Sequence, residues 1–183
     1  LYISKDKEYK IQVEKIKEVV RNINSIFLDG FKIELTDDKS KSNSIIFLGN
    51  KSQIEKDHPT FFDGVNKSFS GLADIEFDWE DFSITSSKIF ISTDEPMDIQ
   101  LSTILEEITQ SIGLPADSTV YPNSIFYENQ LQDGKLNSEY SQLDVDVIKL
   151  LYHPKIKSGF NKFHVKNTFK RILKSEPNIF GNY

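Results

Sequence analysis

The sequence LEEITQSIGL, at residues 105–114, constrains the fold most, because it is the end of an amphipathic helix with a defined stop. The helix begins near Pro96, a residue type favoured in the first turn, and Gly113 permits a left-handed ending and a sharp departure of the chain. Its polar side carries Glu106, Glu107 and Gln110. Its apolar side, which has to be buried, consists of Leu101, Ile104, Leu105, Ile108 and Ile112.

The other patterned segments predict an α+β fold with a small mixed sheet, without the regular βαβ alternation of a doubly wound fold. The predicted helices are residues 7–27, 96–112 and 141–152, followed by a short basic helix at VKNTFKRILKS. The predicted strands are residues 31–35, 44–49 and 87–93. Residues 50–70 have an irregular pattern, and a long loop begins at Pro115.

Length and composition indicate one domain over residues 1–183, with a basic C-terminal extension at about 155–183. The extension holds seven Lys and Arg residues and one acid, whereas the preceding residues hold 15 basic and 27 acidic groups. We expect this extension to fold back on the acidic body, with docking to an anionic membrane or partner as the alternative. The net charge of −6 argues against a nucleic-acid surface for the whole chain.

Two features of the composition bear on compartment and metal chemistry. The chain has no Cys, so it has no disulfide and no thiolate zinc site, and no apolar run is long enough to span a bilayer. The first residue is Leu1 rather than Met, from which we expect that a leader has been removed. We therefore expect an exported protein that is periplasmic, secreted or lipid-anchored at the cell surface.

The polar side of the 96–112 helix has the spacing of a zinc-binding helix. Two ligands at positions i and i+4 can hold one ion, and the residue after the first can polarise the bound water. The pattern resembles the metzincin motif H-E-x-x-H-x-x-G-x-x-H, in which a glycine turn brings the third His to the metal. In that alignment Glu107 and Gly113 match, but the three His positions hold Glu106, Gln110 and Ala116.

Further segments resemble those of metzincin-like domains. YSQLDVDVIKLLY is similar to the C-terminal helix that packs behind the zinc helix of matrix-metalloprotease-like domains. YPNSIFYE lies where such domains have the Met-turn, and Ile125 falls near the methionine position. The segment GLA…SKIFIST, at residues 71–93, lies where they place the edge strand along the substrate cleft. Residues 71–160 also resemble a bacterial family of uncharacterised, exported proteins with an E-E-L-T-Q-x-L-G-L helix. The resemblance implies a metzincin-like (zincin) fold with a degenerate zinc helix.

The sequence does not predict a metal centre. Gln110 is a poor substitute for imidazole and Ala116 offers no ligand. If Asp117 turned inward, Glu106, Gln110 and Asp117 would form an oxygen-rich set that favours Ca²⁺ over Zn²⁺. The chain's histidines, which are not paired at ligand spacing, are His58, His153 and His164. We therefore expect no cofactor, with zinc or calcium as the alternatives.

Two structural interpretations of Glu106 and Glu107 remain open. Both side chains can form a solvated face beside a cleft, which is the usual position of Glu. Alternatively, a carboxylate bonds the YPNSIFYE loop or a backbone N–H and so replaces the metal as a crosslink, which we expect for at least one of them.

Three functions are compatible with these patterns. The first is a non-catalytic metalloprotease-like domain that binds a polypeptide or surface ligand in a retained cleft, where a strand near Lys88–Thr93 accepts an extended peptide by strand addition. The second is an active metallopeptidase with a non-standard ligand set, binding through Glu106, Gln110 and Asp117 and using Glu107 as general base. The third is a scaffold or adhesion module that uses the basic extension. None of them involves nucleic acid, and the oligomeric state is left open.

Overall fold

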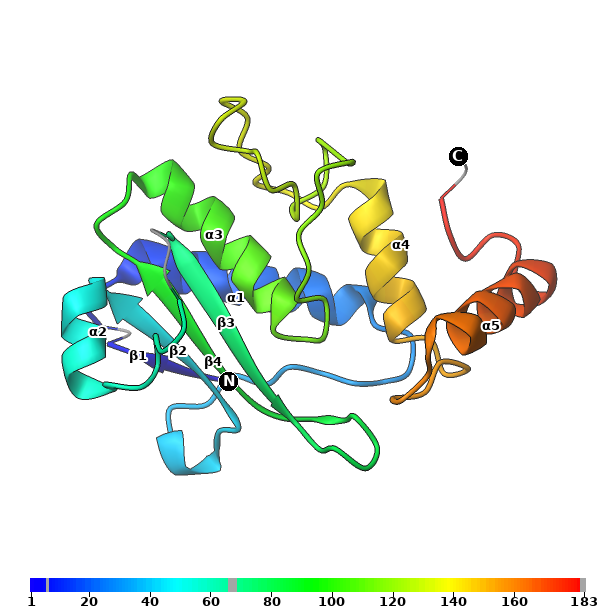
Figure 1. Ribbon diagram of the computed structural model, residues 1–183, viewed down its shortest axis with the longest axis horizontal. Helices are drawn as coiled ribbons and strands as arrows, with labels where there is room; N and C mark the ends of the chain where they lie inside the picture. The colour runs from blue at the N-terminus through cyan, green and yellow to red at the C-terminus, as the bar shows by residue number, and fades with distance from the viewer. Residues whose placement is uncertain (6, 66–68, 182–183) are drawn as a thin grey trace.

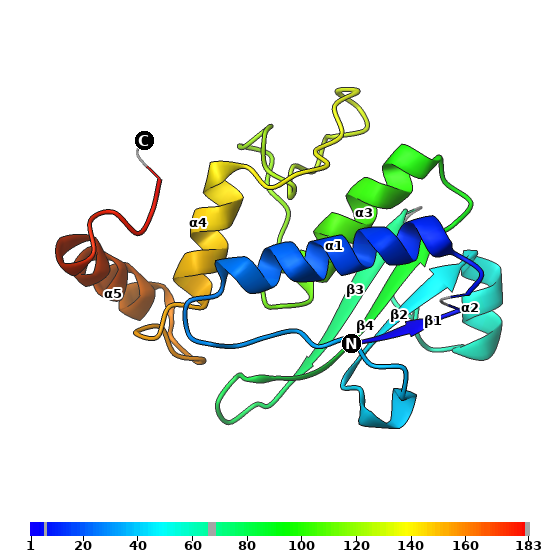
Figure 2. The ribbon, with the colours of Figure 1, turned by 180° about the vertical axis from the view of Figure 1, so that it is seen from behind.

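A computed structural model describes residues 1–5, 7–65 and 69–181, in which five α-helices accompany one four-stranded sheet (Figures 1 and 2). The helices are α1 (Lys10–Ile26), α2 (Lys51–Asp57), α3 (Met97–Gln110), α4 (Gln142–Leu151) and α5 (Lys162–Ser175). The strands are β1 (Tyr2–Ser4), β2 (Ser44–Gly49), β3 (Gly71–Phe77) and β4 (Ile84–Ser92). The predicted α+β class is confirmed.

The sheet is mixed, as predicted, with strand order β1-β2-β4-β3. β1, β2 and β4 are parallel, and β3 pairs with β4 in the antiparallel direction. Ile46 lies opposite Ile89 and Phe47 opposite Phe90, so successive residues point to alternate faces. Each face of the sheet therefore has its own apolar cluster.

One face packs against α1 and α3, which lie side by side across it (Figure 2). The apolar side of the 96–112 segment is buried as predicted, with Ile104 fully buried and Ile108 at 1% exposure. Burying one such side chain contributes about 1.5–3 kcal/mol. A buried hydrogen bond of 2.6 Å from Gln12 to Gln100 joins the two helices and fixes their register.

The other face packs against α2 and the segment that follows it. Ile54 of α2 joins Phe47 and Phe90 in this second cluster. The expectation of irregular structure at residues 50–70 is wrong at 51–57, where Asn50 caps the helix by accepting a hydrogen bond of 2.8 Å from the backbone N–H of Gln53. Residues 66–68 of that segment lie outside the described part of the chain.

The predicted strand at residues 31–35 is not formed. The Asn24 side chain satisfies both backbone groups of Ile33, at 2.8 and 2.9 Å, and the Leu1 amino group donates to the carbonyl of Glu34 at 2.7 Å. The segment is held to α1 and to the N-terminus, and β1 takes the position beside β2.

The predicted helix at residues 141–152 is formed as α4, which contacts α1, while the tyrosines that flank it bond to the C-terminal end of the α3 segment. The Tyr140 hydroxyl lies 2.8 Å from the Thr109 hydroxyl, and the Tyr152 hydroxyl donates to the carbonyl of Ile112 at 3.0 Å. These bonds hold the residues on either side of α4 close to the C-terminal end of the α3 segment. The loop between the two helices therefore begins and ends near the same part of the molecule.

The basic extension contacts α4 and projects from the sheet (Figure 1). Ile172 of α5 is fully buried, and Lys149 of α4 donates to the carbonyl of Ile179 at 2.9 Å. The extension is therefore attached through α4, and none of the ion pairs between described residues joins its Lys or Arg side chains to an acid of residues 1–154. Residues 182–183 lie outside the described part. Among the described residues, no helix has the length and apolarity that a bilayer span requires.

Candidate functional site

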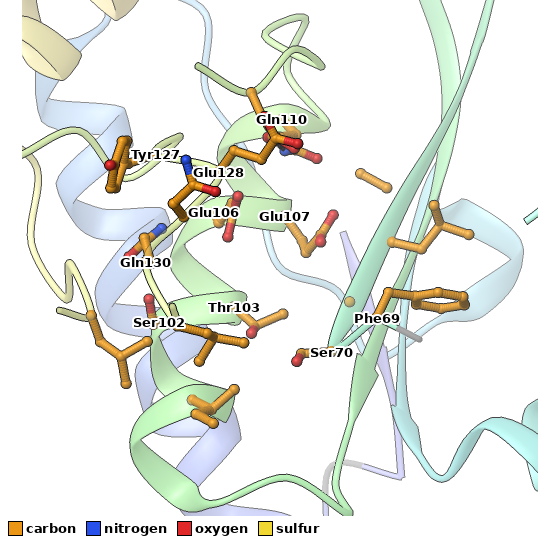
Figure 3. A pocket seen from close by; sticks show the side chains of 18 of the residues that line it. Phe69, Ser70, Ser102, Thr103, Glu106, Glu107, Gln110, Tyr127, Glu128 and Gln130 are labelled. Atoms are coloured by element: carbon orange, nitrogen blue, oxygen red, sulfur yellow. Dashed lines mark hydrogen bonds between the residues drawn. The ribbon is translucent and has the colours of Figure 1, made fainter. Parts of the chain in front are cut away.

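The polar side of α3, the start of β3 and the loop at residues 113–141 enclose a cavity of about 610 Å³ (Figure 3). All four side chains singled out in the sequence line this one cavity: Glu106, Glu107, Gln110 and Asp117. The loop adds side chains that sequence patterns did not indicate, namely Tyr127, Glu128 and Gln130.

β3 is the outer strand next to this cavity. The prediction that Lys88–Thr93 offers an open strand edge is wrong, because β4 is paired on one side with β2 and on the other with β3. Gly71–Phe77 is the edge instead, since β4 is the only strand that pairs with it among the described residues. An edge strand leaves backbone N–H and C=O groups unpaired along one side.

Gly71 allows β3 to approach α3 closely. A Cβ atom at this position would lie 2.4 Å from Cγ2 of Thr103 and 2.7 Å from Cγ of Glu107, which is far inside van der Waals contact. A residue with a side chain would therefore push the strand and the helix apart. The absence of a side chain at Gly71 sets the width of the cavity on this side.

Glu107 is buried between α3 and β3, and Figure 3 shows its side chain pointing toward the strand. The side chain is 7% exposed, and its Oε2 atom has no hydrogen-bond partner among the described residues. Burial raises the pKa of this carboxyl well above its usual value, the charges of Glu106 and Asp117 add to the rise, and a hydrogen bond from the Ala73 backbone opposes it. A solvated position, one of the two interpretations, is wrong for Glu107.

Glu106 lies half-buried on the loop side of α3. Burial, followed by repulsion from Asp117, raises the pKa of its carboxyl to about 8. Asp117 stands at the exposed rim and accepts a hydrogen bond from the Gln110 amide, with 2.9 Å between Nε2 and Oδ1. Partial burial and the charge of Glu128 raise the pKa of Asp117, and the Gln110 bond lowers it.

The loop is fixed by Asp144 at the start of α4. Its carboxylate, only 1% exposed, accepts hydrogen bonds from the Ser124 hydroxyl at 2.5 Å and the Ile125 N–H at 3.2 Å. It also accepts from the N–H and hydroxyl of Ser141, both at 2.8 Å, in a capping box. Asp144 therefore makes the carboxylate crosslink to the YPNSIFYE loop, which neither Glu106 nor Glu107 makes. The other form of the expected crosslink, a bond from a backbone N–H to one of the two glutamates, is made by Ala73 to Glu107.

Two buried amides hold the rest of the loop. Gln130 donates to the carbonyl of Ile125 at 2.8 Å and accepts from the N–H of Asn137 at 2.7 Å. Asn137 donates to the carbonyl of Ser124 at 2.7 Å, and its own carbonyl accepts from Ser102 of α3 at 3.1 Å. Tyr127 and Glu128 are thus presented to the cavity by an ordered segment. These contacts lie within an irregular loop or join it to α3, and no helical or strand periodicity indicates them.

The zinc pattern implied by the resemblance does not fit these donors. A hydrolytic zinc site needs three protein ligands, and Ala116 offers none while the Gln110 amide is engaged with Asp117. Among the described residues, no group of three or more His, Cys, Asp or Glu side chains is placed to hold a metal ion. The open three-ligand site that zinc hydrolysis requires is therefore not built from these side chains.

The histidines do not supply the missing ligands. His153, at the end of α4, is 3% exposed but does not line the cavity. Its Nε2 atom lies 3.3 Å from Glu176 Oε2, and its Nδ1 atom accepts from the N–H of Lys155 at 3.1 Å. It caps the turn after α4 and ties that turn to the C-terminal extension.

The chain belongs to a family of proteins of unknown function (DUF2927), whose model matches residues 3–171. The matched segment contains the whole cavity lining, and the expected membership of an uncharacterised family is confirmed. No curated protein and no solved structure matches the chain.

Proposed function

We propose that the chain is a non-catalytic, metalloprotease-like domain of an exported protein, which binds a polypeptide in the cleft between β3 and α3. One observation carries the proposal: the outer edge of β3 borders an acidic cavity that the polar side of α3 lines. An extended peptide can add to such an edge by backbone hydrogen bonds, while the cavity receives one of its side chains.

The order of elements supports a metzincin-like arrangement. An antiparallel edge strand runs beside the helix that carries the degenerate motif, Gly113 ends that segment with a φ of +110°, and a second helix packs behind it after the loop. The metzincin resemblance places a substrate cleft in this position. Ile125, at the position of the Met-turn methionine, is 1% exposed and joins the apolar cluster under α3.

The state of Glu107 supports binding without cleavage. A general base has to be ionised to accept a proton, but burial raises the pKa of Glu107 well above its usual value. Burial therefore disfavours the ionised form of Glu107 that a general base requires. The donors around it also do not fit a zinc ion that would activate water.

Selection from a displayed library of random peptides tests the proposal. We expect selected peptides to bind the protein and to lose affinity when Tyr127→Ala or Gln110→Leu alters the cavity. Two methylated versions of a selected peptide should then be compared, one with methyl groups on the backbone nitrogens of its odd positions and one with them on its even positions. One version should lose binding and the other should keep it, because only one of the two sets of N–H groups faces β3.

The alternatives give different outcomes in the same experiment. Mass spectrometry should recover the peptide intact; cleavage that a chelator prevents and that Glu107→Ala abolishes would support the metallopeptidase instead. Binding that survives every cavity variant but is lost when the α5 lysines are neutralised would support a scaffold or adhesion module. Either result overturns the proposal.

A further inference from the structure

The cavity gathers four carboxyl groups from two elements, and its described lining contains no Lys, Arg or His. Figure 3 shows Glu106 and Glu107 on α3 and Glu128 on the facing loop, and Asp117 also lines the cavity. The groups act on one another, since Asp117 raises the pKa of Glu106 and Glu128 raises that of Asp117. Such mutual repulsion favours a ligand that brings positive charge.

The chain neutralises acids elsewhere but not here. Glu176, for example, lies 2.6 Å from the ammonium of Lys155, whereas none of the ion pairs between described residues includes an acid of the cavity. Phe69 of the lining does carry a cation over its ring, the ammonium of Lys51 at 4.5 Å. Lys51 belongs to α2 on the opposite face of the sheet and does not line the cavity.

Glu107 places beside the cavity a carboxyl oxygen for which the described residues offer no hydrogen-bond partner. Its side chain is more than nine-tenths buried and its Oε2 atom has no partner among the described residues. Buried polar atoms in folded proteins are almost always hydrogen-bonded, so an unpaired carboxyl oxygen beside a cavity is suited to a donor from a ligand.

We infer that the cavity recognises a cationic side chain of the bound polypeptide, the ammonium of lysine or the guanidinium of arginine; this inference rests on the proposed peptide-binding function. Both groups carry several N–H donors and no acceptor, so one cation can satisfy Glu107 and Glu106 together. A divalent cation fits less well, because the described residues offer no group of three acidic or imidazole donors in ligating positions.

Proton release should accompany this recognition. Glu106 and Glu107 of α3 line the cavity with Asp117, Glu128 and the Tyr127 phenol of the loop, and the described residues of the facing strand add no titratable side chain to the lining. Because the pKa of Glu106 is about 8, a cation that enters near neutral pH favours the carboxylate and displaces its proton. Affinity should therefore rise with pH from about 6 to about 8, and calorimetry in two buffers of different ionisation enthalpy should measure protons released.

The direct test compares butylguanidinium with its uncharged analogue butylurea by ¹H–¹⁵N NMR titration of the intact chain. We expect butylguanidinium, but not butylurea, to shift the backbone signals of Gly71, Ala73 and Asp117. The double variant Glu106→Gln and Glu107→Gln should weaken this binding about tenfold or more. Gln mimics the protonated acid, so the variant should fold; the matched control Glu55→Gln, an exposed acid on α2, should bind within about twofold of the unchanged chain.

A peptide selected from the library separates this inference from the proposed function. Each Lys of the peptide is replaced by norleucine and each Arg by citrulline. One of these replacements should weaken binding of the peptide to the unchanged chain about tenfold. The replaced peptide should bind the double variant Glu106→Gln and Glu107→Gln with little further loss of affinity. A peptide that binds the cleft equally well without any cation overturns the inference and leaves the proposed function standing.

Two other results are decisive. If no library peptide binds the cleft, the proposed function fails, and the preference of the cavity for a cation is decided by the butylguanidinium titration alone. If CaCl₂ shifts the same signals at lower concentration than butylguanidinium, the cavity selects a divalent cation and the inference is wrong. Equal binding of butylurea and butylguanidinium also overturns it.

Discussion

Glu106 and Glu107 are neighbours in sequence, but their carboxyl groups meet different surroundings. Glu107 points from α3 into the contact with β3, where water is excluded, whereas Glu106 faces the loop and keeps partial contact with solvent. In both cases burial is the main cause of the raised pKa. Each carboxyl therefore binds its proton more tightly in the folded chain than in the unfolded chain.

The stability of the chain should consequently fall as pH rises. Below the unfolded pKa of Glu106, about 4.5, both states are protonated and the group has no effect. Between that pH and about 8, Glu106 is ionised in the unfolded state but still protonated in the folded state, so the free energy of unfolding decreases as pH rises. Above the folded pKa the carboxyl is ionised in both states, and the free energy of unfolding decreases no further on its account. Because Glu106 keeps some solvent contact, we expect a loss of about 1–3 kcal/mol over this range.

Urea denaturation at a series of pH values measures this effect. Glu106→Gln should flatten the decline, because Gln does not titrate. The matched variant Glu55→Gln, at an exposed position, should follow the unchanged chain. A free energy of unfolding that increases between about pH 5 and pH 8, or an equal slope in all three proteins, contradicts the assignment.

A second residue-scale prediction concerns Asp144. Its carboxylate accepts four hydrogen bonds while almost fully buried, so Asp144→Asn replaces an acceptor with an amide donor that faces other donors. We expect a loss of about 2–4 kcal/mol in urea denaturation. Ser124→Ala, which removes one partner, should cost about 1 kcal/mol. Equal losses in both variants would show that Asp144 does not organise the loop.

At this scale the sequence indicated part of the site. Glu106, Glu107 and Gln110 were found because helical spacing places them together, and Asp117 because the turn at Gly113 returns the chain toward the helix. The contributions of Glu128 and Asp144 were missed, since they depend on how the loop folds over α3. Spacing along a chain predicts neighbours on one helix, but not neighbours brought together by a loop.

At the scale of elements, the contact between β3 and α3 determines the shape of the cavity. Gly71→Ala should force the two elements apart, because its Cβ would overlap Thr103 and Glu107. We expect a loss of about 1–3 kcal/mol in thermal or urea unfolding and weaker peptide binding. The matched variant is Gly49→Ala at the end of β2, where the nearest atom to a Cβ is 3.5 Å away. Similar losses in both variants would contradict a special role for Gly71.

The elements differ in how well local patterns predicted them. The apolar stripes of α1, α3 and α4 are long enough to identify a helix, whereas α2 has seven residues and buries only Ile54. Strand pairing is decided by distant segments: β1 takes the place beside β2, and β3 rather than β4 becomes the edge. Hydrophobic alternation predicts a half-buried strand at residues 31–35. Hydrogen bonds from Asn24 and Leu1 instead satisfy backbone groups of this segment without strand pairing.

At the scale of the molecule, charge is divided between two regions. Residues 1–154 hold 15 basic and 27 acidic groups and carry the cavity acids, whereas the seven basic residues of the extension lie on or near α5. No residue of α5 lines the cavity, so the extension does not neutralise it. A cationic peptide therefore approaches a body with a net charge of −12, and the long-range field should accelerate its association.

This steering predicts a strong dependence on ionic strength. The association rate of a lysine-containing peptide, measured by stopped-flow fluorescence, should fall about three- to tenfold between about 0.02 M and about 0.3 M salt, because the Debye length shortens to less than about 10 Å. Dissociation should change less, since the buried contacts at Glu107 are poorly screened. The paired change Lys166→Gln and Lys170→Gln on α5 makes the chain more negative and should raise the association rate slightly. Loss of binding in that variant would mean that the peptide docks on the basic extension and not in the acidic cavity. A rate that salt does not change would contradict steering by the acidic body.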